Sequence, residues 1–314
     1  MLATPTFVGA DVSKAHLDVA FPAAARIWRT TNDATGIAAL RRRLAKLERP
    51  HLVCEATGGY TRRLARELAE QGIAFSKVNP RQVRDFARAS GRLAKTDAID
   101  AEVILSFAQV MKPPAVSPPP AAQLRLTDLV RRRRQLVDML AMEKQHGVLP
   151  DDTEIVASIR GHLDFLAEQI KSIDHSIDQQ IQNDTELVHR ATLLRTIPGF
   201  GAVTAATLIA ELPELGRIGK KQIAALLGVA PMNRDSGQMR GQAHIGGGRR
   251  SARCILYMAT IVAIRFNPVI RPFYKRLRQE GKPPKVAIVA AMRKLIIAAN
   301  AMLEQNQPWS STQA

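Results

Sequence analysis

The chain has 314 residues, 46% of them hydrophobic, so two domains with sizeable cores are expected. Lysine and arginine outnumber aspartate and glutamate by 45 to 28, and the net charge of +17 indicates a polyanionic partner, most often nucleic acid. Two distant cysteines exclude a disulfide framework and fit a reducing cytoplasm. No signal peptide and no run of about 18 apolar residues is visible, so we expect no membrane partner.

The first third of the chain alternates strand and helix patterns. We predict strands at residues 6–10, 17–21, 26–30, 52–55 and 73–78, and helices at 35–48 and 60–71. Three strands followed by alternating helices and strands are typical of a mixed sheet covered by helices. We therefore assign residues 1–111 to an α/β domain, in which functional groups gather at strand ends.

Four carboxylates in this region stand where the backbone pattern predicts exposure. Asp11 and Glu55 each end an apolar strand pattern, whereas Asp97 and Asp100 open a helical pattern three residues apart and so share one helix face. Hard cations take oxygen ligands, so the four acids predict a Mg²⁺ site, with two ions as in many nucleases. The alternative is that Asp97 and Asp100 only favour a helix start, while Asp11 and Glu55 are turn acids.

A proline-rich linker is predicted at residues 112–123, followed by two long helices at 124–188. Apolar residues of the second helix recur between 159 and 177 in alternating steps of four and three, which matches a heptad seam. The seam indicates a helical hairpin or a coiled coil. In the second case it would join protomers into a dimer or tetramer.

The remainder, residues 189–314, reads as a mainly α domain. Pro198, Gly199 and Gly201 lie in a short turn between two helical patterns and resemble a helix-hairpin-helix motif. Exposed backbone N–H groups of such a turn bind a DNA phosphate without reading sequence. The alternative is an ordinary turn between two helices.

A glycine-rich, basic insertion interrupts this helical part. It places Ser236 between Arg234 and Arg240, with Arg249 and Arg250 following. A serine among arginines is suited to attack a phosphodiester, because guanidinium groups offset the developing charge. From these residues alone, a loop that only contacts phosphate is the simpler interpretation.

Taken together, these motifs resemble a family of insertion-sequence transposases. The resemblance rests on residues 9–14, 55–58, 95–101, 197–201 and 236–237, and it covers nearly the whole chain. Members pair a four-acid, ribonuclease H-like domain similar to Holliday-junction resolvases with a serine-bearing transposase domain, and some are guided by a bridge RNA. Residues 238–244 depart from the pattern, because we expect a more basic run there.

The resemblance implies that Asp11, Glu55, Asp97 and Asp100 hold Mg²⁺ and that Ser236 forms a covalent phosphoserine bond with DNA. It also implies element ends and target DNA as partners, and action on the nucleoid in the cytoplasm. Two rival hypotheses stay open. One is a metal-dependent, Holliday-junction-resolvase-type nuclease that uses the acids alone. The other is a non-catalytic nucleic-acid-binding scaffold whose acids are structural.

Overall fold

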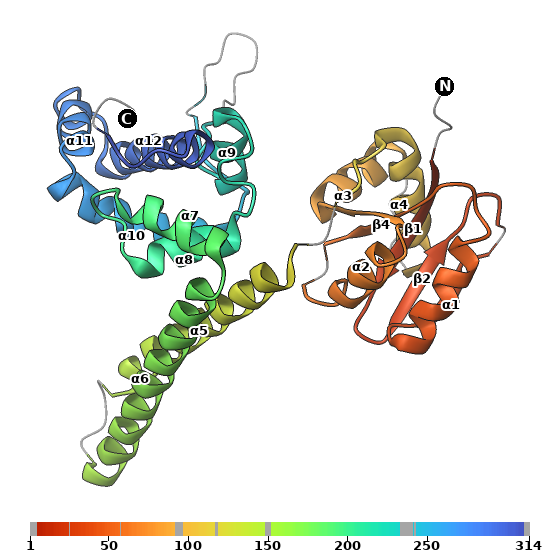
Figure 1. Cartoon of the computed structure of the whole chain (residues 1–314), viewed down its shortest axis with the longest axis horizontal. Coiled ribbons are helices and arrows are strands. Elements are labelled where there is room, and N and C mark those ends of the chain that lie inside the picture. Colours follow the sequence, from red (N-terminus) through yellow and green to blue (C-terminus); the bar gives the residue numbers. More distant parts are fainter. Residues whose placement is uncertain are drawn as a thin grey trace. The chain divides into compact units, whose positions relative to one another are not determined.

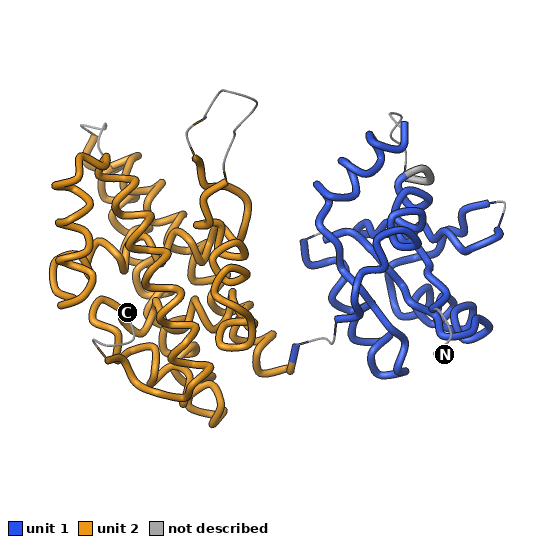
Figure 2. Tube along the Cα trace, turned by 90° about the horizontal axis from the view of Figure 1, so that it is seen from above, with its two compact units in different colours: residues 1–119 blue, residues 120–314 orange. Residues whose placement is uncertain are grey.

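The computed structural model describes residues 5–24, 26–56, 58–91, 97–116, 119–147, 152–232, 241 and 243–310, with only the backbone described for 97–99. The chain divides into two compact units, residues 1–119 and 120–314 (Figure 2). The division falls inside the proline-rich segment that the sequence predicts as a linker.

The first unit is an α/β structure (Figure 1). Its elements, in chain order, are β1 (Thr6–Val12), β2 (His16–Ala20), β3 (Trp28–Thr31), α1 (Ala34–Leu44), β4 (Pro50–Glu55), α2 (Arg62–Ala69), β5 (Ala74–Val78), α3 (Pro80–Ala89) and α4 (Asp97–Met111).

The described strands form one sheet in the order β3-β2-β1-β4-β5. Pairs β1–β2 and β2–β3 are antiparallel, whereas β1–β4 and β4–β5 are parallel. The predicted mixed sheet is therefore confirmed. Helix α3 was not predicted, although Asn79 caps it by accepting a hydrogen bond from the Arg81 N–H and Pro80 occupies its first turn.

Helices cover both faces of this sheet. Alternate residues of β1 point to opposite faces, so Val8, Ala10 and Val12 pack with α1 and α2 in one core. Phe7 and Val53 lie on the other face, where they pack with α3 and α4. Position 9 and the side chain of Asp11 consequently face α4.

The second unit is helical, as predicted for the remainder of the chain. Its described helices are α5 (Ala121–His146), α6 (Thr153–Gln182), α7 (Thr185–Arg195), α8 (Ala202–Glu211), α9 (Lys220–Leu227), α10 (Arg250–Phe266), α11 (Ile270–Gln279) and α12 (Pro284–Gln305).

Helices α5 and α6 form a long antiparallel hairpin (Figure 1). Arg133 pairs with Asp174, and nearer the tip His162 lies 3.1 Å from Glu143. The predicted heptad seam of α6 faces α5 of the same chain, with Leu166 fully buried. The hairpin is thus an intrachain pair, and its use in joining protomers stays a prediction.

The last helix, α12, lies at the centre of the second unit. It packs against α7, α9, α10 and α11, and its buried residues include Ala291, Leu295 and Ala299. Its length of 22 residues and a mean hydropathy of 1.8 also meet the criteria for a membrane span, but 56% of that window is buried. Its burial among four helices accounts for the apolar sequence, because a core helix is hydrophobic all round.

Candidate metal and nucleic-acid site

Asp11 and Glu55 are neighbours at the carboxyl edge of the sheet. Strands β1 and β4 are parallel, and Ala10 pairs with Cys54. Asp11 and Glu55 each follow these residues by one position, so they occupy equivalent places on adjacent strands and point to the same face. Neighbouring strands lie about 4.8 Å apart, so the sheet itself holds the two carboxylates close together. Both residues are half-buried.

Helix α4 covers this same face of β1 because Gly9 has no side chain. A Cβ at Gly9 would lie 2.5 Å from the Ala101 carbonyl oxygen and 2.4 Å from the Leu105 nitrogen. The part of α4 around Ala101 and Leu105 therefore rests on the face that bears Asp11. The turn before it contains Asp100, which is half-buried, and Asp97, whose side chain lies outside the described residues.

The structure brings Asp11 and Glu55 together without forming a complete ligand group. Within the described side chains, no three Asp, Glu, His or Cys residues could together hold a metal ion. Asp11 and Glu55 are placed on one face at one edge of the sheet, and Asp100 stands in the first turn of the helix that covers this face. Their assignment as metal ligands, and that of Asp97, stays a prediction.

The pKa of Cys54 reflects the charges of Asp11 and Glu55. Burial raises the pKa of this thiol to about 12; the positive charge of Lys77 opposes the rise, whereas the negative charges of Asp11 and Glu55 add to it. Both carboxylates therefore act on the same buried group. Cys54 stays protonated near neutral pH, so it is no candidate nucleophile.

A third carboxylate beside Asp11 escaped the sequence interpretation. Asp18 of β2 pairs directly with Asp11 across the antiparallel ladder. It is buried, and Arg29 donates two hydrogen bonds to it, of 2.7 and 2.9 Å. The guanidinium offsets the Asp18 charge, which allows a second acid beside Asp11. Side chains alternate between the two faces of a strand. In residues 16–20 this alternation was the available signal that Asp18 shares a face with a residue of the neighbouring strand.

The predicted helix-hairpin-helix turn joins α7 to α8. Gly199 has φ 109° and packs against α10, where an added Cβ would lie 3.0 Å from the Ala259 carbonyl oxygen. The Pro198 carbonyl oxygen accepts a 3.3 Å hydrogen bond from Asn267. Gly201 is instead exposed at the start of α8, with open space around it. Phosphate binding by this turn stays a prediction, and Gly201 with the first amides of α8 is the part of the turn that is open to solvent.

The insertion that carries Ser236 has a well-defined base. Met232 and His244 exchange backbone hydrogen bonds of 2.8 and 3.1 Å. Below them, Gly228 and Gly248 both have positive φ and approach so closely that a Cβ on either would collide with the other segment. The two ends of the insertion therefore lie side by side on the helical unit. Ser236, Arg234 and Arg240 lie outside the described residues.

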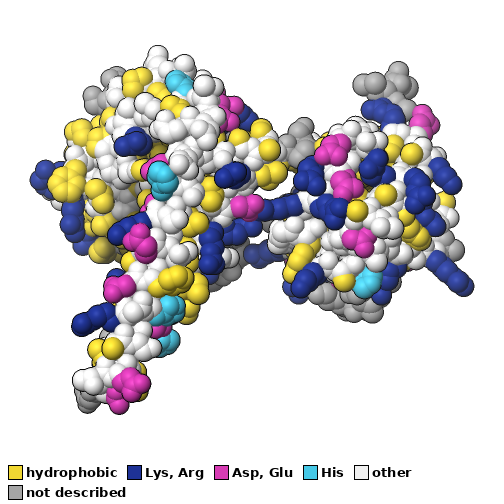
Figure 3. Space-filling view, turned by 60° about the horizontal axis from the view of Figure 1, so that its bottom comes forward, with side chains coloured by type: hydrophobic (Ala, Val, Ile, Leu, Met, Phe, Trp, Pro, Cys, Tyr) yellow, Lys and Arg dark blue, Asp and Glu magenta, His cyan; other side chains and the backbone are white. Residues whose placement is uncertain are grey.

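The two arginines after the insertion differ. Arg249 is half-buried and donates two hydrogen bonds to the Glu214 carboxylate and one to the Glu211 carbonyl oxygen. Burial favours the protonated form of Glu214, but the bonds from Arg249 outweigh it and lower the pKa of Glu214. Arg249 therefore holds the start of α10 to the end of α8 and the segment that follows it. Arg250 begins α10 and is exposed, so it is the better placed of the two for a phosphate. Figure 3 shows further Lys and Arg side chains over the visible face of each unit.

Known proteins are similar to this chain over most of its length. The DEDD transposase model of the IS110 type matches residues 8–147, and the model for transposases of the IS116/IS110/IS902 family matches residues 191–275. The pilin gene-inverting protein of Moraxella bovis is 30% identical over 319 residues, covering 97% of each chain. An uncharacterized 42 kDa protein of insertion element IS900 from Mycobacterium paratuberculosis is 28% identical, over 53% of this chain and 42% of its own length.

The chain therefore belongs to the IS116/IS110/IS902 family of transposases. These homologues indicate that it is an enzyme, a DNA transposase or recombinase.

Proposed function

We propose that this protein cuts and rejoins DNA at the ends of an insertion sequence and at a target site. The observation that carries the proposal is the pairing of Asp11 and Glu55 at the carboxyl edge of a mixed sheet, beneath a helix that begins with Asp97 and Asp100. This is the arrangement expected of a ribonuclease H-like nuclease centre. The net charge of +17 suits a polyanionic substrate around that acidic centre.

The four acids would hold Mg²⁺ through carboxylate oxygens. The donor set fits this ion, because it contains only hard oxygen ligands. When bound, Mg²⁺ would offset charge on the scissile phosphate and on the leaving oxygen. The neighbouring Asp18 carboxylate is already neutralised by Arg29, so it does not compete for the ion.

Ser236 would supply the nucleophile. Its Oγ forms a bond to phosphorus while the bond between phosphorus and one deoxyribose oxygen breaks, and that oxygen leaves as a hydroxyl. The hydroxyl proton of the serine is lost in the same exchange, so protons balance. Attack by a hydroxyl from the other DNA end reverses these steps and rejoins the strands without net hydrolysis. Arg234 and Arg240 flank the serine in sequence and would offset charge on the phosphate.

The other proposed partners are those expected of this transposase family. Gly201, the α8 amides and Arg250 would bind phosphates of the DNA, and a guide RNA would direct the enzyme as in some members. The α5–α6 hairpin would support a dimer or tetramer that acts on nucleoid DNA in the cytoplasm. In such an oligomer, Ser236 of one protomer would work with the acids of another.

A covalent-trapping assay tests the proposal. The full chain, with its co-purified RNA retained, is mixed with labelled element-junction DNA and Mg²⁺, denatured and resolved on a gel. We expect a protein–DNA adduct that is lost in Ser236→Ala and in Asp11→Ala. Free cleaved strands that persist in Ser236→Ala would instead indicate a metal-dependent resolvase. Binding without cleavage of any branched substrate would indicate a scaffold.

Mixing variants tests the shared active site. A Ser236→Ala protomer and an Asp11→Ala protomer each lack one half of the proposed machinery. If the halves meet between protomers, mixed oligomers regain adduct formation. Mixed oligomers that form but stay inactive would assign both halves to one protomer.

A further inference from the structure

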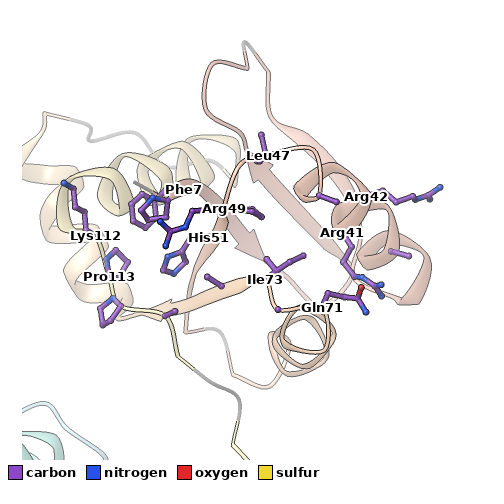
Figure 4. A pocket seen from close by; sticks show the side chains of 18 residues that line it. Phe7, Arg41, Arg42, Leu47, Arg49, His51, Gln71, Ile73, Lys112 and Pro113 are labelled. Carbon is purple, nitrogen blue, oxygen red and sulfur yellow. The ribbon is translucent and has the colours of Figure 1, made fainter. Parts of the chain in front are cut away.

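A basic hollow lies at the opposite edge of the sheet from the acids. It has a volume of about 970 Å³ and crosses the edge where β1, β4 and β5 begin (Figure 4). Its lining includes Arg41, Arg42, Arg49 and Lys112, and no Asp or Glu lines it among the described residues. Arg41 also lies 4.0 Å from Glu67, which is outside the lining. Four residues of strand separate it from the acids, about 13 Å at 3.3 Å per residue. The hollow is therefore a separate site.

Charge and apolar surface alternate along this hollow. Figure 4 shows Arg41 beside Gln71 toward one end, and Arg49 and Lys112 toward the other. Between them the lining is apolar and includes Leu47, Pro50 and Ile73. Cations at both ends match phosphates, and an apolar middle matches an unstacked base.

Two of these cations stand on strained backbone. Arg49 has φ 48° and Lys112 has φ 45°, values that L-residues other than glycine rarely adopt. Lys112 directly follows α4, and its N–H donates a 2.9 Å hydrogen bond to the Ala108 carbonyl oxygen. Glycine is the residue that favours this helix-ending position. A lysine there is tolerated at a cost, and such strain tends to occur at functional sites.

The wall that carries Lys112 is fixed in place. Buried His51 is hydrogen-bonded to the Ser76 hydroxyl at 2.7 Å, and this hydroxyl donates a 2.6 Å bond to the Pro114 carbonyl oxygen. The Val116 N–H donates to the Phe75 carbonyl oxygen at 2.8 Å. The segment after α4 is thus tied along β5, so the hollow is preformed rather than assembled on binding.

We propose that this hollow binds an unpaired DNA strand, with phosphates on Arg41, Arg49 and Lys112 and a base over the apolar middle. A duplex keeps its bases stacked inside, whereas a single strand can present phosphate and base together. The proposal rests on the proposed function only in taking DNA as the polyanion. The site would hold a strand about 13 Å from the acids while another part of that DNA is cut.

Salt-dependent binding tests the site apart from catalysis. Full-length protein carrying Asp11→Asn, without added metal, is titrated with a fluorescent single-stranded DNA at several salt concentrations. Each lost phosphate contact lowers the slope of log K against log salt by about 0.7, so Arg49→Ala with Lys112→Ala should lower it by about 1.4. The matched control, Arg66→Ala with Arg88→Ala, removes two exposed cations of the same unit outside the hollow.

Lys112→Gly separates binding from folding. Glycine relieves the left-handed backbone, so we expect a higher Tm together with weaker DNA binding. Equal slopes for the hollow and control double variants, or unchanged binding in a more stable Lys112→Gly protein, would overturn the site. Tighter, hollow-dependent binding of RNA of the same sequence would overturn the assignment to DNA. None of these results depends on whether the acids cut DNA.

Discussion

The two units present their chemical groups in different ways. In the first unit, hydrogen-bonded strands set Asp11 beside Glu55, and the missing Cβ of Gly9 lets α4 lie over them. In the second unit, Ser236 belongs to an insertion whose ends are held together by Gly228, Gly248 and the Met232–His244 pair. The sheet fixes the relative places of Asp11 and Glu55, whereas in the helical unit the described contacts fix the two ends of the insertion.

This difference suggests a division of labour. Carboxylates that share a metal ion need fixed spacing, which a sheet edge provides. In the second unit, the close approach of Gly228 and Gly248 sets where the insertion leaves the helical core.

Removing a carboxylate from the sheet edge should have the largest effect. Asp11→Asn keeps the size of the side chain but removes its charge, so we expect about a 1000-fold loss of strand cleavage or more. Single-turnover cleavage with Mg²⁺ measures it. Asp85→Asn, an exposed acid of α3, is the control and should cleave normally. Equal rates for the two variants would mean that Asp11 has no catalytic role.

Lifting α4 from the sheet should disturb the acids as a group. Gly9→Ala forces a Cβ into the backbone at Ala101 and Leu105, which should cost about 1–3 kcal/mol of unfolding free energy and about 100-fold in cleavage. Gly36→Ala is a matched clash against the Thr31 carbonyl oxygen, on the other face of the sheet. It should lose stability but keep cleavage in the folded fraction. The same drop in cleavage for both would contradict the role given to α4.

Opening the base of the serine insertion should test the second unit. Gly228 and Gly281 have the same φ of 79°, but a Cβ meets the Gly247 carbonyl oxygen at 2.4 Å only at Gly228. Gly228→Ala should therefore cost about 2–5 kcal/mol and reduce the covalent adduct. Gly281→Ala should cost only about 1–2 kcal/mol and leave the adduct unchanged. Chemical denaturation and the trapping assay measure the two effects.

The folding stability of the first unit should depend weakly on pH. Burial lowers the pKa of His51 below its ordinary value of 6.5, so the unfolded chain binds a proton that the folded chain rejects. Stability should therefore fall as pH drops below about 6.5 toward the folded pKa. His51→Gln, which retains a hydrogen-bonding group, should remove that slope from Tm measured against pH. An unchanged slope would assign it to other groups.

Much of the first unit could be predicted from the sequence, because its strands are apolar runs bounded by turns. The places of Asp11 and Glu55 followed from where those runs end. The register between consecutive strands was not predictable, so the buried Asp18–Arg29 pair beside Asp11 was missed. The apolar spacing of α6 predicted a partner helix, and α5 of the same chain packs against it. Spacing alone does not distinguish a partner helix in the same chain from one in another protomer, so the coiled coil stays a prediction.

The glycines of the second unit show the same limit. Gly199 and Gly201 stand two residues apart in one predicted turn, yet Gly199 packs on α10 while Gly201 is open to solvent. Arg249 and Arg250 likewise differ, since the first is engaged by Glu214 and the second is exposed. Tertiary contacts decide each case, and local sequence does not contain them.

Iron-dependent cleavage of the protein backbone tests the central claim most directly, because it locates a bound metal without requiring DNA cleavage. Fe²⁺ replaces Mg²⁺, ascorbate and peroxide generate hydroxyl radicals at the ion, and the cut positions are mapped. Cuts near Asp11, near Glu55 and at the start of α4, all lost in Asp11→Asn and retained in Asp85→Asn, are the predicted result. Cuts elsewhere, or a pattern unchanged by Asp11→Asn, would contradict a metal centre at this edge of the sheet.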